Sequence, residues 1–180
     1  MKAILALCII FLVSCSKRQD LQIIVIPNGD FENWTAAPVL LNWETNSCPM
    51  CVPPYDPYTV KQETNAYSGH YAAKFIYNHV FYAWAINKFP LLVHPTVLSG
   101  YMKANFTTTD TTLVKVNLYK NMLLADSGYQ TVSSSISDYT YFEIPITQNN
   151  LTIDSAVVTI HGGKKDGTIF WVDNLYFIKR

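Results

Sequence analysis

VKVNLY (residues 114–119) alternates aliphatic residues with polar ones and a tyrosine, and this pattern decides the fold class. Successive side chains of a β-strand point to opposite faces, so Val114, Val116 and Leu118 share one face. The other face then carries an amine, an amide and a phenol. The stretch therefore predicts a strand that is buried on one side only, as is common in antiparallel sheets.

Strand-like segments recur on both sides of this stretch. Alternating or mainly apolar patterns predict strands at residues 23–26, 71–77, 81–89, 97–106, 142–146, 156–160 and 169–178. Gly, Pro and Asn residues separate these segments, and none of them has helical periodicity. We expect an all-β fold, an antiparallel β-sandwich of about nine or ten strands, whose strand count favours a jelly roll over a seven-stranded immunoglobulin-type domain.

Prolines and glycines predict the irregular regions. Residues 35–58 contain five prolines, which central strands exclude, so we expect a long loop there. Pro145 interrupts the pattern of residues 142–146 and predicts an edge strand or a bulge. The segment GGKKDG (residues 162–167) predicts the tip of a charged hairpin rather than a phosphate site.

The N-terminus has the features of a targeting signal. Lys2 precedes an unbroken apolar run of eleven residues, from Ala3 to Val13. Such a run rises about 16 Å as a helix, and a membrane span needs roughly twenty residues. It therefore predicts a cleaved signal peptide.

The end of this run and the two residues after it, Leu12-Val13-Ser14-Cys15, resemble the lipobox of bacterial lipoproteins. The resemblance implies that the Cys15 thiol is acylated and anchors the protein to a membrane, at the outer membrane or cell surface. The alternative is an ordinary secretory signal followed by an unmodified cysteine. The expected organisation is a lipoprotein signal peptide at 1–14, a lipidated tether at 15–22 and a β-sandwich domain at 23–180.

Composition excludes two classes of protein. The chain has 13 basic and 13 acidic residues, so no net positive charge favours nucleic acid as a partner. Charged and aromatic residues each make up 14% of the chain, whereas a disordered chain is rich in charge and poor in aromatics. We expect an ordered domain.

Cys48 and Cys51 form a CPMC segment inside the proline-rich stretch. A redox motif would need a βαβ context and a zinc site would need further ligands, and the sequence offers neither. In an oxidising compartment we expect a local disulfide between them, with free thiols, or catalysis or metal binding, as alternatives.

Two motifs at the ends of the domain carry a family resemblance. The segment NGDFENW (residues 28–34) opens the domain, and GTIFWVDNL (residues 167–175) closes it. Both resemble the jelly-roll (galactose-binding-like) carbohydrate-binding modules, and more closely still the carbohydrate metabolism domain found in bacterial surface lipoproteins. The likeness covers residues 27–180 and implies that the first and last strands lie side by side.

The same resemblance implies a structural calcium ion between these strands. Its expected ligands are Glu32 and Asp173, with Asp30 and Asn28 as further candidates. Asn174 departs from the pattern, because many relatives have a second Asp at this position. The alternative is that the polar residues only cap turns or strand ends.

Five aromatic residues are candidates for stacking on a sugar ring: Trp43, Tyr55, Tyr58, Tyr82 and Trp84. Tyr55 and Tyr58 lie in the proline-rich loop beside the expected disulfide. Tyr82 and Trp84 are two residues apart on a predicted strand, so their rings share one face. The alternative is that these rings are part of the core.

No catalytic motif stands out, because no pair of carboxylates has a sequence context typical of a glycosidase. We expect a non-catalytic surface lipoprotein that binds a polysaccharide or glycan and presents it to neighbouring enzymes or importers. The first alternative is a structural or protein-interaction module of a surface complex or adhesin. The second alternative is a glycan-cleaving enzyme.

Overall fold

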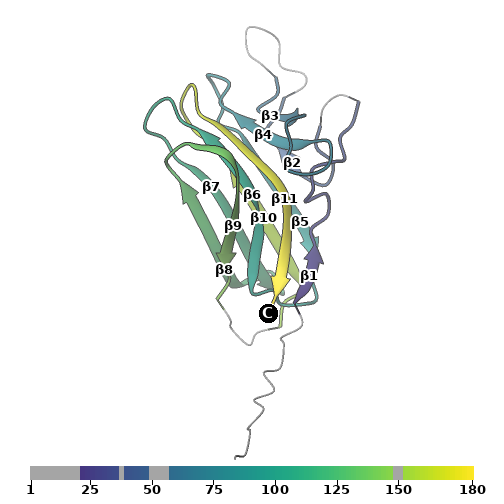
Figure 1. Cartoon of the computed structure of the whole chain (residues 1–180). Coiled ribbons are helices and arrows are strands. Elements are labelled where there is room, and N and C mark those ends of the chain that lie inside the picture. Colours follow the sequence, from purple (N-terminus) through teal and green to yellow (C-terminus); the bar gives the residue numbers. More distant parts are fainter. Residues whose placement is uncertain (1–20, 37–38, 49–56, 148–151) are drawn as a thin grey trace, which may run out of the picture.

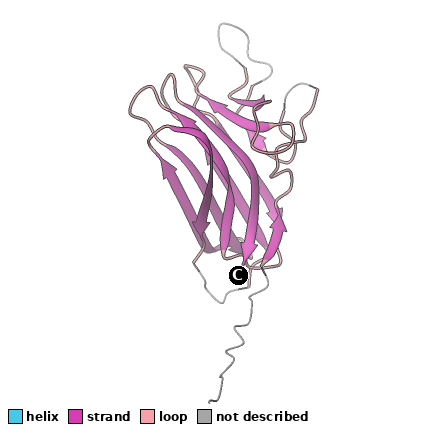
Figure 2. Cartoon of the chain, viewed as in Figure 1, coloured by secondary structure: helices cyan, strands magenta, loops and turns pink. Residues whose placement is uncertain are grey.

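The computed structural model describes residues 21–36, 39–48, 57–147 and 152–180. These residues form eleven strands and no helix, arranged as two antiparallel sheets packed face to face (Figure 1 and Figure 2). The all-β jelly-roll sandwich expected from the sequence is confirmed. No helix in this part of the chain has the length and hydrophobicity of a membrane span.

The sheets contain six and five strands. The six-stranded sheet has the order β3 (Val60–Glu63), β4 (Ala72–Ile76), β11 (Ile169–Lys179), β6 (Val97–Asn105) and β9 (Ile136–Pro145), with β1 (Gln22–Val25) also paired to β11. The five-stranded sheet has the order β2 (Glu44–Thr45), β5 (Trp84–Pro90), β10 (Ser155–His161), β7 (Thr112–Lys120) and β8 (Leu123–Val132).

The core lies between the two sheets and follows the period of two. In β7 the side chains of Val114, Val116 and Leu118 are fully buried, and the residues between them are partly exposed. From the opposite sheet, β11 contributes Phe170 and Phe177, which are also fully buried. The apolar alternation in the sequence therefore marks the inner face correctly.

Two features differ from the sequence-based expectations. Strands β2, β3 and β8 were not predicted, because none has a clean apolar alternation and all lie at sheet edges, and β2 falls inside the loop expected at 35–58. The loop at residues 162–168 is not a hairpin tip, because it joins β10 in one sheet to β11 in the other. Pro145 ends β9, which is an edge strand as expected.

The two motifs that carry the resemblance are neighbours in space. Strand β1 pairs with the C-terminal half of β11, and Leu175 N–H donates to the carbonyl of Gly29 at 2.7 Å. A Cβ at position 29 would lie 2.4 Å from the carbonyl oxygen of Leu175, so only glycine permits this approach. The register of β11 shifts between Asp173 and Tyr176, next to Asn174 at φ 50°.

The N-terminal predictions lie outside the described residues. The signal peptide at 1–14 and the lipidated Cys15 stay predictions. The tether at 15–22 also stays a prediction, and only its residues 21 and 22 are described. Gln22 is the first residue of β1, so the sandwich begins within a residue of the expected boundary at 23. Among the described residues, Ile23 and the C-terminal β11 belong to one sheet.

Candidate functional site

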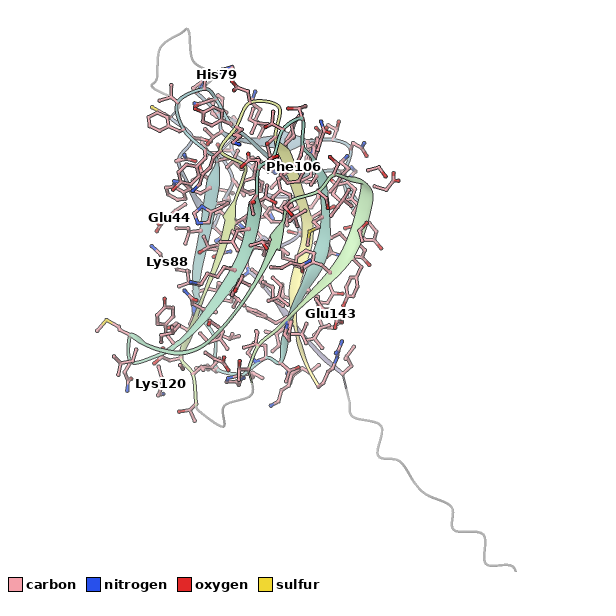
Figure 3. The ribbon with its side chains drawn as sticks, turned by 90° about the vertical axis from the view of Figure 1, so that its left-hand side faces the viewer. Glu44, His79, Lys88, Phe106, Lys120 and Glu143 are labelled. Atoms are coloured by element: carbon pink, nitrogen blue, oxygen red, sulfur yellow. The ribbon has the colours of Figure 1, made fainter. Side chains whose placement is uncertain are left out.

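A depression of about 530 Å³ lies on the outer face of the five-stranded sheet. It is bounded by the loop before β5, the loop before β7 and the loop after β10. Figure 3 shows His79 and Phe106, from neighbouring loops, at this end of the sandwich. Its lining residues are Tyr82, Thr109, Asp110, Thr111, Leu113, Thr131, His161, Gly162 and Lys164.

The sheet register places the floor of this depression. His161 in β10 pairs with Trp84 of β5 on one side and with Leu113 of β7 on the other. Leu113 in turn pairs with Thr131 of β8. Directly paired residues point to the same face, so these four side chains form one row across the sheet, and three of them, His161, Leu113 and Thr131, line the depression.

Tyr82 forms the aromatic wall of the depression. Its ring centroid lies 5.7 Å from that of His161 at an interplanar angle of 37°, and Lys164 Nζ lies 5.3 Å from its centroid. The Tyr82 side chain remains 38% exposed. One ring therefore has cationic and aromatic neighbours and still offers surface to solvent.

Asn46 fixes the backbone that carries Tyr82 and Trp84. Its Nδ2 donates to the carbonyl of Tyr82 at 2.7 Å, and its Oδ1 accepts from Trp84 N–H at 3.0 Å. The same oxygen accepts from Thr59 Oγ1 at 2.8 Å. This amide was not a candidate in the sequence, because nothing in the spacing links residue 46 to residue 84.

Asp110 holds the loop at 162–168 in place through hydrogen bonds. Its Oδ2 accepts from the backbone N–H groups of Lys164 at 2.8 Å and Lys165 at 2.9 Å, and from Thr168 Oγ1 at 2.8 Å. Burial raises its pKa, but these hydrogen bonds and the one from Thr111 outweigh burial and hold the pKa below its ordinary value. Asp110 is therefore ionised and engaged in holding the loop.

His161 is neutral at neutral pH. Burial lowers its pKa, and the positive charges of Lys164 and Lys115 lower it further. A neutral imidazole has one N–H donor and one acceptor nitrogen, which suits a ligand rich in hydroxyl groups.

The structure places the five predicted aromatics in four different ways. Tyr82 and Trp84 lie on the outer face, exposed and half-buried respectively, as their shared parity predicts. Tyr58 is half-buried, and Tyr55 lies outside the described residues. The structure brings neither Tyr58 nor Trp84 into the lining of the depression, so Tyr82 alone of the five lines it among the described residues.

The expectation for Trp43 is wrong. Its side chain is only 5% exposed and packs against Phe31 at a centroid distance of 5.3 Å. Its indole N–H donates to the carbonyl of Asn28 at 3.0 Å, so both its apolar surface and its polar atom are used inside the fold. Burial with a satisfied N–H is the ordinary state of a core tryptophan.

A second group of aromatics covers the outer face of the six-stranded sheet. We call it the tyrosine cluster: Tyr67, Tyr101, Tyr139, Tyr141 and Trp171. Tyr67 stacks on Tyr101 at 3.3 Å between centroids, and Lys103 Nζ lies 4.8 Å from the ring of Tyr139 and 4.5 Å from that of Trp171. Its rings contact each other and Lys103, while Tyr67 and Tyr141 stay 45% and 42% exposed.

Two carboxylates hold the loop that carries Tyr67. Asp173 Oδ2 accepts from Tyr67 N–H at 2.7 Å and from Ser68 N–H at 3.0 Å. Glu32 Oε1 accepts from His70 N–H at 2.7 Å and from Tyr71 N–H at 3.0 Å. The two motif residues are thus linked through one loop, and the resemblance had implied only that their segments lie side by side.

Asp173 is a fully buried carboxylate whose Oδ1 has no hydrogen-bond partner among the described residues. Burial raises its pKa to about 6, and the charge of Glu32 adds to the rise, although hydrogen bonds from Ser68, Tyr67 and Asn174 lower it. An unpaired buried oxygen beside a second carboxylate suits a hard cation such as Ca²⁺. The expected calcium stays a prediction that now depends on these two residues.

The predicted three-carboxylate ligand set does not assemble. No three His, Cys, Asp or Glu side chains within the described ranges come together at a metal-binding spacing. Phe31 has φ 56° and turns the chain between Asp30 and Glu32, so Asp30 is exposed and lines a separate depression beside β1. Asn28 is not free either, because its side chain bonds Asn33 and Leu41.

The Cys48–Cys51 pairing also stays a prediction, because Cys51 lies outside the described residues. Cys48 itself is half-buried, and its N–H donates to the carbonyl of Pro57 at 2.6 Å. This bond closes the base of the proline-rich loop.

The depression lacks the two carboxylates of a glycosidase. Asp110 is the only carboxylate among the described residues that line it, and four donors already occupy its oxygens. Hydrolysis of a glycosidic bond normally requires an acid and a second carboxylate on opposite sides of the bond. The lining residues therefore favour binding over cleavage.

No family profile and no curated protein matches the chain. Solved structures do match its fold. The TmCBM61 module, in complex with β-1,4-galactotriose, has 16% identity and a TM-score of 0.50 over 85% of this chain and 92% of the module. A carbohydrate-binding module of the β-sandwich superfamily has 12% identity and a TM-score of 0.51 over 81% of this chain and 59% of the other.

Larger proteins contain the same fold. The chain spans 57% of a Bacteroides thetaiotaomicron protein described as a glycoside hydrolase, with 13% identity over 68% of this chain and a TM-score of 0.50. At such identities the likeness shows the fold alone. The domain has the jelly-roll fold of carbohydrate-binding modules.

Proposed function

We propose that this protein is a non-catalytic carbohydrate-binding lipoprotein, and that the depression beside Tyr82 is its binding site. One observation carries the proposal: the exposed ring of Tyr82 stands beside His161 and threonine hydroxyl groups in a depression on a rigid sheet. The jelly-roll fold, shared with carbohydrate-binding modules, supports the same conclusion.

The chemistry of the depression suits a pyranose. The C–H face of a sugar stacks on an aromatic ring, here that of Tyr82. Its hydroxyl groups find hydroxyl partners on Thr109, Thr111 and Thr131, and a neutral imidazole on His161. Lys164 supplies a cation at the rim, so a glycan that is neutral or carries carboxylates fits better than a cationic one.

Isothermal titration against a panel of neutral and uronic-acid glycans tests this site. We expect millimolar to micromolar binding by the unaltered protein and a loss of at least about fivefold in Tyr82→Ala, since the stacking of a nucleobase on one aromatic side chain contributes about 1–3 kcal/mol. The matched control is Tyr129→Ala, an exposed tyrosine on the same face of β8 outside the depression. An equal loss in both variants, or no binding to any glycan by folded protein, would contradict the proposal.

The lipid anchor is a separate part of the proposal. Acylation at Cys15 would place the domain at the outer membrane or cell surface, where it could hold a glycan for neighbouring enzymes or importers. Mass spectrometry of the N-terminal peptide reads the modification directly, and Cys15→Ser should move the protein out of the lipidated membrane fraction. An unmodified Cys15 peptide would contradict this part and leave the binding site untouched.

A further inference from the structure

Exposed apolar residues gather at the end of the sandwich opposite the depression. Half of the large hydrophobic residues exposed in the described chain lie there: Leu21, Ile23, Val25, Leu92, Met122, Leu123 and Leu124. Figure 1 shows β1, the end of β11 and the β7–β8 connection together at this lower end, and Figure 3 places Lys120 and Glu143 there. We call these seven residues the apolar end.

The tip of the β7–β8 hairpin is the most prominent part of the apolar end. Asn121 and Met122 have φ of 51° and 64°, the geometry of a two-residue type I′ turn. Glycine is the preferred second residue of this turn, and a methionine with positive φ is energetically unfavourable. Met122 is nevertheless there and is 92% exposed, so neither the turn nor the core explains the choice of residue.

Asp154 joins the hairpin tip to the loop after β5. Its Oδ2 accepts from Asn121 N–H at 2.7 Å, and its carbonyl accepts from Leu91 N–H at 2.9 Å. Its own N–H donates to the carbonyl of Tyr119 at 2.9 Å. These bonds fix the backbone of Leu91, so the next residue, Leu92, is held beside the hairpin although its side chain is 85% exposed.

Strand β1 extends the apolar surface to the point where the chain enters the domain. A depression of about 510 Å³ lies between β1 and the segment Pro90–Val93. The exposed cations Lys120 and Lys179 lie at the same end, at the tip of β7 and the end of β11, together with Arg180, which is ion-paired with Glu143. Aliphatic residues bordered by lysine and arginine are typical of a surface that meets anionic lipid.

The length of the tether decides which partner reaches this end. Five residues separate Cys15 from Leu21, so the two Cα atoms are six steps apart and at most about 20 Å from each other when the chain is fully extended. An acylated Cys15 would hold the apolar end within that distance of the bilayer. Because the tether is short, the effective concentration of lipid at the apolar end would be higher than that of any partner free in solution.

We propose that the apolar end docks on the lipid bilayer, with Met122, Leu123 and Leu124 inserted among the lipid headgroups and upper acyl chains. This inference rests on the proposed lipid anchor. The row at His161 lies six residues along β10 from Ser155 at the apolar end, a rise of about 20 Å. Docking would therefore hold the sandwich upright, with the glycan site facing away from the membrane.

Methionine oxidation on vesicles tests this orientation. The full chain, processed in a bacterial host, is reconstituted in vesicles of phosphatidylethanolamine and phosphatidylglycerol and treated with hydrogen peroxide. The variant Val80→Met supplies a reference methionine next to His79, at the far end of the sandwich. Peptide mass spectrometry then gives both oxidation rates, with buried Met102 as the protected reference.

We expect Met122 to oxidise at least about fivefold more slowly than Met introduced at position 80, although it is more exposed in the protein alone. Leu123→Asp with Leu124→Asp, both at exposed positions, should restore its rate. Equal rates in the lipidated protein would overturn docking while leaving the anchor intact. The same spectra show whether Cys15 carries lipid, and an unmodified Cys15 would overturn the anchor and, with it, this inference.

Discussion

The outer faces of the two sheets are both rich in aromatic residues and, in the part of the chain that the structure describes, each carries a depression, but their rings have different neighbours. On the five-stranded sheet, Tyr82 leans over His161 and keeps part of its surface free. On the six-stranded sheet, Tyr67 is stacked on Tyr101 and the loop above is tied down by Asp173 and Glu32. Aromatic content alone therefore does not identify a binding face. What matters is whether the rings are already paired.

The largest expected effect concerns the paired face. Asp173→Ala removes a buried acceptor of two backbone N–H groups, and we expect it to lower the free energy of unfolding by about 2–4 kcal/mol. Urea denaturation measures this loss. Glycan affinity should stay unchanged, because the depression is on the other sheet. If Asp173→Ala instead lowers glycan affinity and leaves stability unchanged, the binding site lies on the six-stranded sheet and not on the five-stranded one.

Calcium should act on the same face. If Glu32 and Asp173 bind Ca²⁺, a free concentration a hundredfold above Kd adds about 2.7 kcal/mol to stability. Thermal unfolding with calcium and with a chelator measures the shift. The matched control is Glu32→Gln, which should remove the shift. An identical Tm with and without calcium would contradict calcium binding, and the two carboxylates would then serve only to hold the loop.

A smaller effect is expected on the open face. Asn46→Ala removes two bonds to the backbone of Tyr82 and Trp84, so we expect a loss of about 1–2 kcal/mol in stability and a several-fold loss in glycan affinity. Asn65→Ala serves as control, because Asn65 is exposed and bonds through its backbone. Unchanged affinity in a folded Asn46→Ala protein would show that Tyr82 does not need this support.

The smallest effect is that of pH. Burial and nearby lysines lower the pKa of His161, so the folded protein binds this proton less tightly than the unfolded chain does. The contribution of His161 to the free energy of unfolding is therefore fully present above pH 6.5 and is lost as the pH falls below that value. Glycan affinity should be constant between pH 8 and 6.5 in a titration series. A decline already between pH 8 and 7 would show that His161 is charged in that range.

Local patterns in the sequence predicted the layers better than the site. Strands such as β7 were recognisable because inward and outward residues alternate, whereas β8 has exposed residues on both faces and was missed. Parity correctly placed Tyr82 and Trp84 together, but it carries no information on depth, and Trp43 proved to be part of the core. Long-range contacts build the depression, and no spacing in the sequence reveals them. Asp110 accepts a hydrogen bond from the backbone of Lys164 in the lining, and Asn46 bonds the backbone of Tyr82.

Strand β1 also has a mechanical consequence. It pairs antiparallel with β11 over four residue pairs, and its first residue, Gln22, lies opposite Lys179 at the end of the domain. Hydrogen bonds between strands run across the strand axis, so tension along the N-terminal tether loads all four pairs at once instead of unzipping them singly. A cell-surface domain pulled by a long polymer would thus resist detachment through the shear strength of its first strand.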